Sequence, residues 1–211
     1  MSEVNNIFAS VVEHLLQGQV ICEYAYESEY QYLDDEANWR EVDVYLRRVD
    51  RMLKRTLDGT AVFAAYTTLE FSLYRSDVRR GFAETINGLE PLVRWLHMVS
   101  SASRSDRPVT AGDVVRPSRL LESIENAPVL CEELDRLSKT KLLSNNQSTP
   151  RGQLDAILKR LADNGYLVAK GPRAMQYLAT GKWSRLYDVM DFISTHEQLD
   201  VEPEPEQEAL L

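Results

Sequence analysis

The sequence predicts a mainly α-helical protein with small β wings. Three observations predict this fold class. Residues 149–185 show a helix, a tight stop, two short strands around a turn and the start of another helix. Residues 7–70 show a similar but more degraded order of helix, short strand, helices, turn and strand. Hydrophobic residues make up 44% of the 211 residues, which is ordinary for a globular protein. A helix followed by a strand hairpin is the back half of a winged-helix domain, so we expect tandem winged-helix domains.

The helix expected after residue 149 carries the clearest signals. Ser148 or Thr149 can cap its start, and Pro150 suits its first turn. Asn164 and Gly165 end it, because glycine is the least costly residue in the left-handed position after a helix. Its apolar residues follow the helical spacing i, i+3, i+4 and i+7. They are Leu154, Ile157, Leu158 and Leu161.

Two strands and a last helix are expected next. Residues 166–169 and 175–179 have strand patterns, and Gly-Pro-Arg at 171–173 predicts the turn between them. Apolar side chains at helical spacing predict the last helix over residues 183–195. Two further helices are expected upstream, around residues 120–124 and from Pro128 onwards.

In the first half of the chain, the cleanest helical pattern covers residues 39–57. Asp58 and Gly59 predict a turn after it, and residues 61–66 predict a strand. A first helix over residues 7–16, a stop at Gly18, a strand over 20–22 and a short helix within 23–36 are expected before it.

A long helix is expected over residues 77–101. Gly88 and Pro91 are expected to kink or split it, since proline removes a backbone donor and crowds the preceding turn. The polar stretch 100–108 predicts the boundary between domains. The expected division is a winged-helix domain with a long linking helix (1–104), a second winged-helix domain (105–197) and an acidic tail (198–211). The tail should be disordered, because it has little to bury and repels itself.

Charge is distributed unevenly along the chain. The net charge of −9 argues against a protein that coats nucleic acid by bulk electrostatics, but it leaves room for a local basic face. Residues 139–185 hold nine Lys and Arg against two Asp, a net charge of +7. We predict phosphate contacts from this segment. The candidate DNA-binding residues are Arg151, Lys159, Arg160, Lys170, Arg173, Lys182 and Arg185. The alternatives are a solvated face, or pairing with the acidic tail or a partner subunit.

No catalytic, metal or cofactor site is expected. The sequence contains no P-loop, no Gly-x-Gly-x-x-Gly, no Gly-x-Ser-x-Gly and no His-Glu-x-x-His. The three histidines lie far apart, and the acidic run at 34–36 is expected to be a solvated loop. Cys22 and Cys131 are isolated, which favours reduced thiols in a cytoplasmic protein. No signal peptide and no membrane-spanning segment are expected.

Three stretches of the chain resemble a known family. They are the opening helix and strand at 14–21 (HLLQGQVI), the helix start at 39–46 (WREVDVYL), and the second-domain helix and wing at 158–167 (LKRLADNGYL) with 177–182 (YLATGK). With the order of elements over about residues 5–196, they are similar to the MksE/MukE type of bacterial condensin subunit. These subunits are kite proteins, the kleisin-interacting tandem winged-helix elements.

The resemblance implies a non-enzymatic homodimer of the cytoplasm and nucleoid. Its expected partners are a kleisin subunit (MksF/MukF-like) and, through the kleisin, an SMC ATPase (MksB/MukB-like), with DNA bound in the complex and no membrane contact. Such complexes act in chromosome condensation and segregation, and some act in plasmid defence. The family implies no catalytic residues and no cofactor.

Two other function classes stay open from the residues alone. A stand-alone dimeric winged-helix transcriptional regulator would read bases from the helix after residue 149. That helix offers Arg151, Gln153, Lys159, Arg160 and Asn164. An enzyme would need a site assembled from distant residues, and the sequence nominates none.

Overall fold

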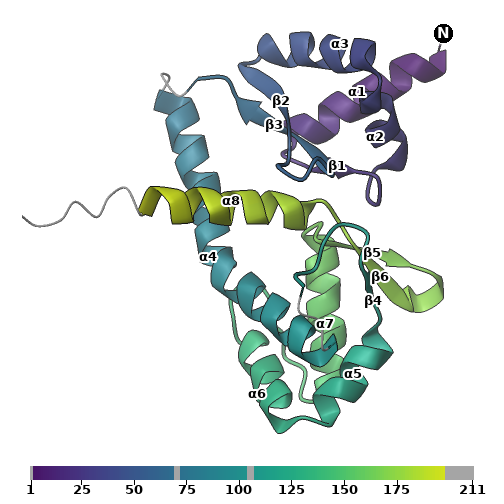
Figure 1. Cartoon of the computed structure of the whole chain (residues 1–211), viewed down its shortest axis with the longest axis vertical. Coiled ribbons are helices and arrows are strands. Elements are labelled where there is room, and N and C mark those ends of the chain that lie inside the picture. Colours follow the sequence, from purple (N-terminus) through teal and green to yellow (C-terminus); the bar gives the residue numbers. More distant parts are fainter. Residues whose placement is uncertain (1, 69–71, 104–106, 198–211) are drawn as a thin grey trace, which may run out of the picture.

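The computed structural model describes residues 2–68, 72–103 and 107–197. Within these residues, helices dominate and the strands form two small antiparallel sheets of three strands each. The predicted fold class, mainly α with small β wings, is confirmed. Two separate hydrophobic cores lie at the two ends of an elongated molecule (Figure 1). The expected acidic tail, residues 198–211, lies outside the described residues.

The N-terminal unit packs three helices against a small sheet. Its core is formed by side chains such as Val11, Leu15, Val42 and Leu46, which are all buried. The third strand lies in the middle, in the order β1-β3-β2. The elements are α1 (Ser2–Leu16), β1 (Ile21–Cys22), α2 (Glu27–Asp34), α3 (Glu36–Arg47), β2 (Arg51–Arg55) and β3 (Ala61–Tyr66).

The helix predicted over residues 39–57 is wrong in its second half. Helix α3 ends at Arg47, and Arg51–Arg55 form strand β2, which pairs with β3 from Arg51↔Tyr66 to Arg55↔Val62. Asp50 has a φ of 55°, which a continuing helix does not allow. The backbone N–H of Leu53 donates to the Asp43 carboxylate at 2.9 Å and so ties the strand to the helix. The predicted turn at Asp58 and Gly59 and the strand after it are confirmed.

Helix α4 (Ser72–Ser103) links the two units. It runs as one helix of 32 residues through Pro91. Of the two outcomes expected there, a kink or a split, the split is therefore wrong. Its C-terminal half, from Leu92 to Val99, contributes buried side chains to the second core. Figure 1 shows the helix descending from the N-terminal unit into the C-terminal one.

The C-terminal unit repeats the strand order of the first. The last strand again lies in the middle, in the order β4-β6-β5. The predicted helix after residue 149 is confirmed: Thr149, and not Ser148, caps it by accepting a hydrogen bond from the Gly152 N–H at 3.1 Å, and Gly165 follows it with a φ of 75°. The elements are β4 (Val114–Val115), α5 (Pro117–Glu125), α6 (Pro128–Leu137), α7 (Pro150–Asp163), β5 (Leu167–Lys170), a 3₁₀ turn (Pro172–Ala174), β6 (Gln176–Ala179) and α8 (Lys182–Glu197).

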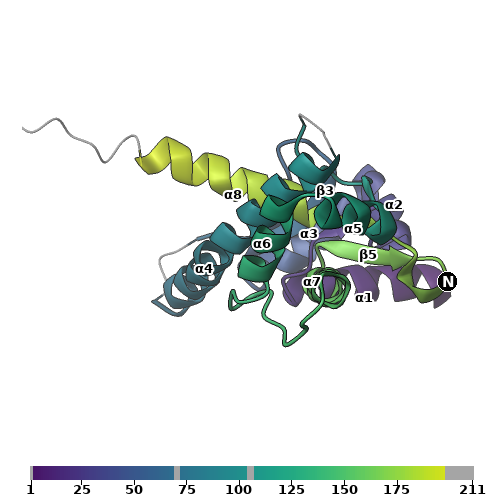
Figure 2. The same ribbon diagram turned by 90° about the horizontal axis from the view of Figure 1, so that it is seen from below.

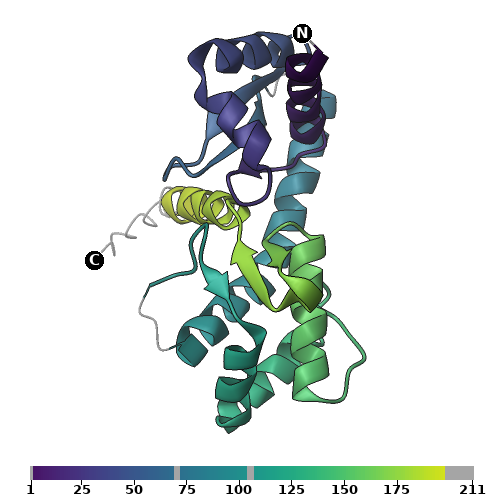
Figure 3. The same cartoon turned by 90° about the vertical axis from the view of Figure 1, so that its right-hand side faces the viewer.

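The start of α8 lies between the two units (Figure 3). The N–H of Gly181 donates to the Cys22 sulfur at 3.2 Å, and a Cβ at Gly181 would overlap the Cβ of Ala61. The hydroxyls of Thr60 and Ser184 are 2.9 Å apart. These contacts join the sheet of the first unit directly to the second unit. None of the helices described is both long and apolar enough to cross a membrane.

Candidate nucleic-acid interface and docking groove

Helix α7 buries one face and exposes the other. Its buried face includes Leu154, Ile157 and Leu158, and its exposed face carries Arg151 and, two turns on, the neighbours Lys159 and Arg160. Strand β5 lies beside α7 (Figure 2) and ends at Lys170, which is also exposed. None of these four basic side chains makes an ion pair with a residue that the structure describes. They are therefore free to meet phosphate. The side chain of Arg173 lies outside the described residues.

Two acids reduce the charge of this face. Asp155 lies four residues after Arg151, and Asp163 lies four residues after Lys159, so charges of opposite sign follow one another along the helix. The pKa of the Tyr177 phenol is raised, mainly by burial. The negative charges of Asp155 and Asp163 raise it further. The face is therefore only moderately positive.

Lys182 and Arg185 lie elsewhere, in the cleft between the two units. The Lys182 ammonium donates to the Asn164 carbonyl oxygen at 2.7 Å and lies 4.9 Å from the centre of the Tyr166 ring. The Arg185 guanidinium lies 4.2 Å from the centre of the Phe63 ring. Burial lowers the pKa of both side chains. The sequence placed both residues among the DNA candidates by charge alone. In the structure, Arg185 contacts Phe63 of the first unit, whereas Lys182 contacts Asn164 and Tyr166 within the second unit.

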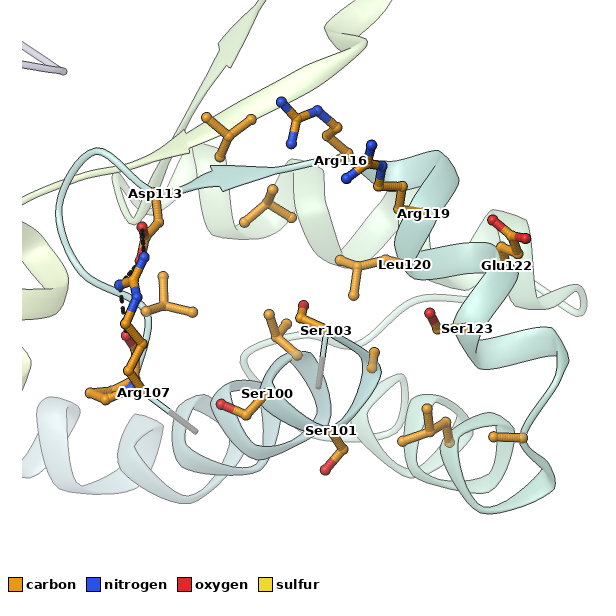
Figure 4. Close-up of a pocket in the computed structure, with 18 of the residues that line it drawn as sticks. Ser100, Ser101, Ser103, Arg107, Asp113, Arg116, Arg119, Leu120, Glu122 and Ser123 are labelled. Atoms are coloured by element: carbon orange, nitrogen blue, oxygen red, sulfur yellow. Dashed lines mark hydrogen bonds and ion pairs between the residues drawn. The ribbon is translucent and has the colours of Figure 1, made fainter. Parts of the chain in front are cut away.

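A groove of about 770 Å³ lies between the end of α4, strand β4 and helix α5 (Figure 4). Ser100 and Ser103 come from α4, and Arg116 and Arg119 flank the start of α5 on the opposite side. Both arginines are exposed and make no ion pair with any described residue. The groove thus has serines on one side and Arg116, Arg119 and Glu122 on the other, with apolar side chains such as Leu120 between them.

An ion pair closes one end of this groove. The guanidinium of Arg107 donates to both carboxylate oxygens of Asp113, at 2.8 and 2.6 Å. The N–H of Thr110 donates to the same carboxylate at 2.8 Å. Burial would raise the pKa of Asp113, but these hydrogen bonds outweigh it, and the pKa lies below its ordinary value.

Strand β4 forms the upper margin of the groove. Within the described part of the chain it pairs with β6 alone, so its other edge is open there, and the side chain of Val114 is 40% exposed. An open strand edge beside a groove can accept an extended peptide as a further strand. This site was not predictable from the sequence, because a strand of two residues is too short to show a period-2 pattern. Its only sequence signal was Val114-Val115 before the helix-starting Pro117.

The acidic run at 34–36 has local structural partners. The carboxylate of Asp34 pairs with Arg55 at 3.1 Å, and Glu36 pairs with Arg40 at 3.2 Å. Asp35 caps α3 by accepting hydrogen bonds from two backbone N–H groups. Among the described residues, no group of three or more His, Cys, Asp or Glu is placed to hold a metal ion.

The comparisons with known proteins identify one family. The family model described as condensin complex protein MksE matches residues 6–179. The matched range takes in both small sheets, the groove and helix α7, and ends at the last residue of β6. No curated protein matches the chain.

Proposed function

Because the chain belongs to the family of the condensin complex protein MksE, we propose that it is the kleisin-binding, non-enzymatic subunit of a bacterial SMC complex. The family match, which spans both units, is the observation that carries this proposal. ATP hydrolysis belongs to an MksB/MukB-like SMC partner, which the chain reaches through an MksF/MukF-like kleisin. The complex organises chromosomal DNA or acts in plasmid defence, in the cytoplasm and at the nucleoid.

The two units act as winged-helix domains in this proposal. The repeated strand order, with the last strand central in both sheets, supports it. The proposed domains are residues 1–104, with α4 as the linking helix, and residues 105–197. The hairpins β2–β3 and β5–β6 are then the two wings. Residues 198–211 form an acidic tail beyond the second domain.

The groove beside β4 is the proposed kleisin site. An extended kleisin segment would pair with the open edge of β4 and cover Val114. The arginines Arg116 and Arg119, which form no ion pair within the described residues, favour a segment with acidic side chains. Main-chain pairing provides affinity, and the arginines provide selectivity for charge.

DNA contact is proposed for α7 and the second wing. Arg151, Lys159, Arg160 and Lys170 are exposed and make no ion pair with described residues, which supports phosphate contact. The alternating acids on α7 support a contact that depends on the assembled complex. In this proposal Arg185 stabilises the junction of the two domains, and Lys182 stabilises the end of α7 within the second domain.

The test measures kleisin binding by the purified full chain. We expect a stable complex with a kleisin encoded in the same cell, and at least about a tenfold loss of affinity in the variant R116E/R119E. The matched control K54E/K141E reverses two exposed lysines outside the groove and should bind normally. Unchanged binding by R116E/R119E would reject the groove. Failure of the natural chain to bind any kleisin would reject the function.

A further inference from the structure

Acidic residues alternate with other residues in the stretch that follows helix α8. We call residues 200–208 the acidic segment; no Lys or Arg interrupts it. Side chains of an extended strand point to alternate sides, so all of its carboxylates would point to one side when the segment is extended. The segment could then direct its whole charge at one partner surface. Its acids are Asp200, Glu202, Glu204, Glu206 and Glu208.

Two prolines fall between these acids at positions that allow strand pairing. Pro203 and Pro205 have no backbone N–H, so a strand that contains them can pair only along its other edge. Backbone N–H groups alternate between the two edges of a strand, so those of Glu202, Glu204 and Glu206 share the edge without prolines. The segment can therefore pair with one open sheet edge, while its prolines prevent a further strand from adding to it.

The open edge of β4 lies beside two arginines. Val114 is 40% exposed and Val115 is buried, so the side chains of β4 alternate between solvent and core. Arg116 continues this alternation with an extended backbone, φ −106° and ψ 110°, and so shares the exposed side with Val114. Arg119 follows one turn later on α5, and Figure 4 shows both arginines where β4 leads into α5. A strand that paired with β4 could bring carboxylates to both charges.

The charges of the groove favour an acidic partner. Arg116 and Arg119 are exposed and make no ion pair within the described part of the chain. Arg107 and Asp113 neutralise each other, and the remaining acid among the described lining residues is Glu122. Two arginines against one carboxylate leave the β4 side of the groove positive. A segment with several acids complements this charge.

Helix α8 begins its course at the groove and ends near the acidic segment. The Tyr187 hydroxyl donates to the carbonyl oxygen of Val109, a groove residue, at 2.7 Å. From Tyr187 to Glu197, where α8 ends, the helix rises by about 15 Å at 1.5 Å per residue. The acidic segment therefore starts a short distance from one end of the groove.

The segment is long enough to return to the arginines. The N–H of Asp113 donates to the carbonyl oxygen of Thr110 at 3.1 Å, so the chain folds back beside Val109. Arg116, three residues after Asp113, then lies about 10 Å further along the groove. Residues 198–208 can span about 36 Å when extended. This length exceeds the combined distance along α8 and the groove.

We propose that the acidic segment docks in the β4 groove of its own chain as an added strand. Its carboxylates meet Arg116 and Arg119, and its proline-free edge pairs with β4. Because the segment is attached to α8, its effective concentration at the groove is on the order of millimolar, so weak contacts are enough to fill the groove. The docking needs no other protein. Its consequence rests on the proposed function: a kleisin that uses this groove has to displace the segment.

Binding of a peptide tests the docking without a kleisin. A fluorescent peptide with the sequence of residues 198–211 is titrated into the full chain at about 0.15 M salt and followed by anisotropy. In the neutralised chain, D200N/E202Q/E204Q/E206Q/E208Q, the attached segment has lost its charge. This chain should bind the peptide at least about tenfold more tightly than the natural chain, whose groove is already occupied.

Charge reversal in the neutralised chain locates the peptide. Adding R116E/R119E should weaken peptide binding about tenfold or more. Adding the control K54E/K141E, which reverses two exposed lysines outside the groove, should leave peptide binding unchanged. Because Arg116 and Arg119 are exposed, the reversed chain should fold, and circular dichroism checks this.

Exchange of one neighbouring pair of residues tests the added strand. A peptide with E204P/P205E keeps its composition and charge, but its prolines at positions 203 and 204 remove an N–H from both edges. It should bind about fivefold more weakly or worse, because a pairing hydrogen bond to β4 is lost. Equal binding of the two peptides would overturn the strand.

Other results would overturn the docking as a whole. They are no peptide binding by the neutralised chain at about 1 mM, which is the effective concentration expected of the attached segment, equal binding by the natural and neutralised chains, and unchanged binding after R116E/R119E. A loss confined to K159E/R160E/K170E would place the segment on α7 and would also overturn it.

Kleisin binding by the same chains is a separate measurement. The neutralised chain should bind a kleisin about tenfold more tightly than the natural chain, because no attached segment competes. Failure of both chains to bind any kleisin would reject the proposed function, whereas the peptide titrations would still decide the docking.

Discussion

Single residues set the distance between the two units. Gly181 lies where the start of α8 meets the first sheet, and its N–H bonds to the sulfur of Cys22. A side chain at this position has no space, because its Cβ would overlap the Cβ of Ala61 and lie 2.9 Å from that of Cys22. Both neighbours are fully buried, so they cannot turn away. The closeness of the two units thus depends on one glycine.

Gly181→Ala should therefore destabilise the chain. Overpacking a buried contact costs about 1–3 kcal/mol, and we expect that loss in the free energy of unfolding measured with urea. Gly88→Ala is the matched control. Gly88 lies in helix α4, and a Cβ added there would lie 3.7 Å from Cδ2 of Leu142, an ordinary van der Waals distance. The change should therefore be neutral or stabilising, since alanine favours a helix more than glycine does. Equal stability of the two variants would contradict the close approach at Gly181.

Asp113 makes the end of the groove sensitive to acid. Its pKa is lowered in the folded chain by hydrogen bonds from Arg107 and Thr110. A carboxyl group with a lowered folded pKa stabilises the fold above its unfolded pKa of about 3.9, and this stabilisation is lost as the pH falls through the folded pKa.

Asp113→Asn should lower the melting temperature at pH 7. The difference from the natural chain should shrink as the pH falls below about 4, because the natural carboxyl group then also becomes neutral. Thermal unfolding over a pH series measures this difference. The control Glu125→Gln changes an exposed carboxylate on α5 and should show little effect at any pH. A difference that is constant with pH would show that the Asp113 charge does not stabilise the fold.

At the scale of elements, helices and strands were predictable from the sequence where the residues within the element itself determine its conformation. Helix α7 was predictable because its cap, its proline, its apolar period and its terminal glycine all agree. Strand β2 was missed because Leu46, Val49 and Leu53 continue a helical period past the end of α3. The long-range pairing of β2 with β3, together with Asp50 and Asp43, decides the conformation there. A strand pairing of this kind cannot be recognised from the residues of one short stretch of sequence alone.

The cap of α7 offers a test of this local control. Thr149→Ala removes the hydroxyl that accepts the Gly152 N–H and should cost about 1 kcal/mol of unfolding free energy. Ser148→Ala removes a neighbouring hydroxyl that does not cap the helix and should be nearly neutral. Chemical denaturation of both variants gives the comparison. A larger destabilisation by Ser148→Ala would mean that Thr149 is not the cap.

The exposed bases of α7 and β5 predict a salt-dependent effect on DNA binding. Charge reversal of Lys159, Arg160 and Lys170 should weaken DNA binding by the assembled complex. It should also reduce the slope of log affinity against log salt by about one for each phosphate that is no longer neutralised. The control K54E/K141E reverses two exposed lysines outside α7 and β5 and should keep the natural slope. Unchanged affinity and slope after reversal at α7 and β5 would place the DNA elsewhere.

The candidate sites themselves were only partly predictable. The excess of positive charge in residues 139–185 identified four candidate DNA-binding residues that are exposed in the structure: Arg151, Lys159, Arg160 and Lys170. It could not separate them from Lys182 and Arg185, because the contact of Arg185 with Phe63 and that of Lys182 with Asn164 form only when separate elements pack together. The groove beside β4 was not predictable, since an open strand edge is a property of the sheet order and not of the strand's own residues.

At the scale of the whole molecule, two similar units are held at a fixed spacing by α4 and the start of α8 (Figures 1 and 3). The proposed surfaces lie on different parts of this frame. Both the β4 groove and the α7 face belong to the second unit, where they lie on different elements. Such an arrangement suits a chain whose work is to join other chains.

The most direct test of the central claim is the composition of the native complex. The chain is captured from its own cells at physiological salt, and stoichiometric partners are identified by mass. We predict a kleisin and an SMC-type ATPase in fixed ratio with the chain. A chain captured without either of them, as a dimer bound to one defined DNA sequence, would contradict the proposed function and favour a transcriptional regulator.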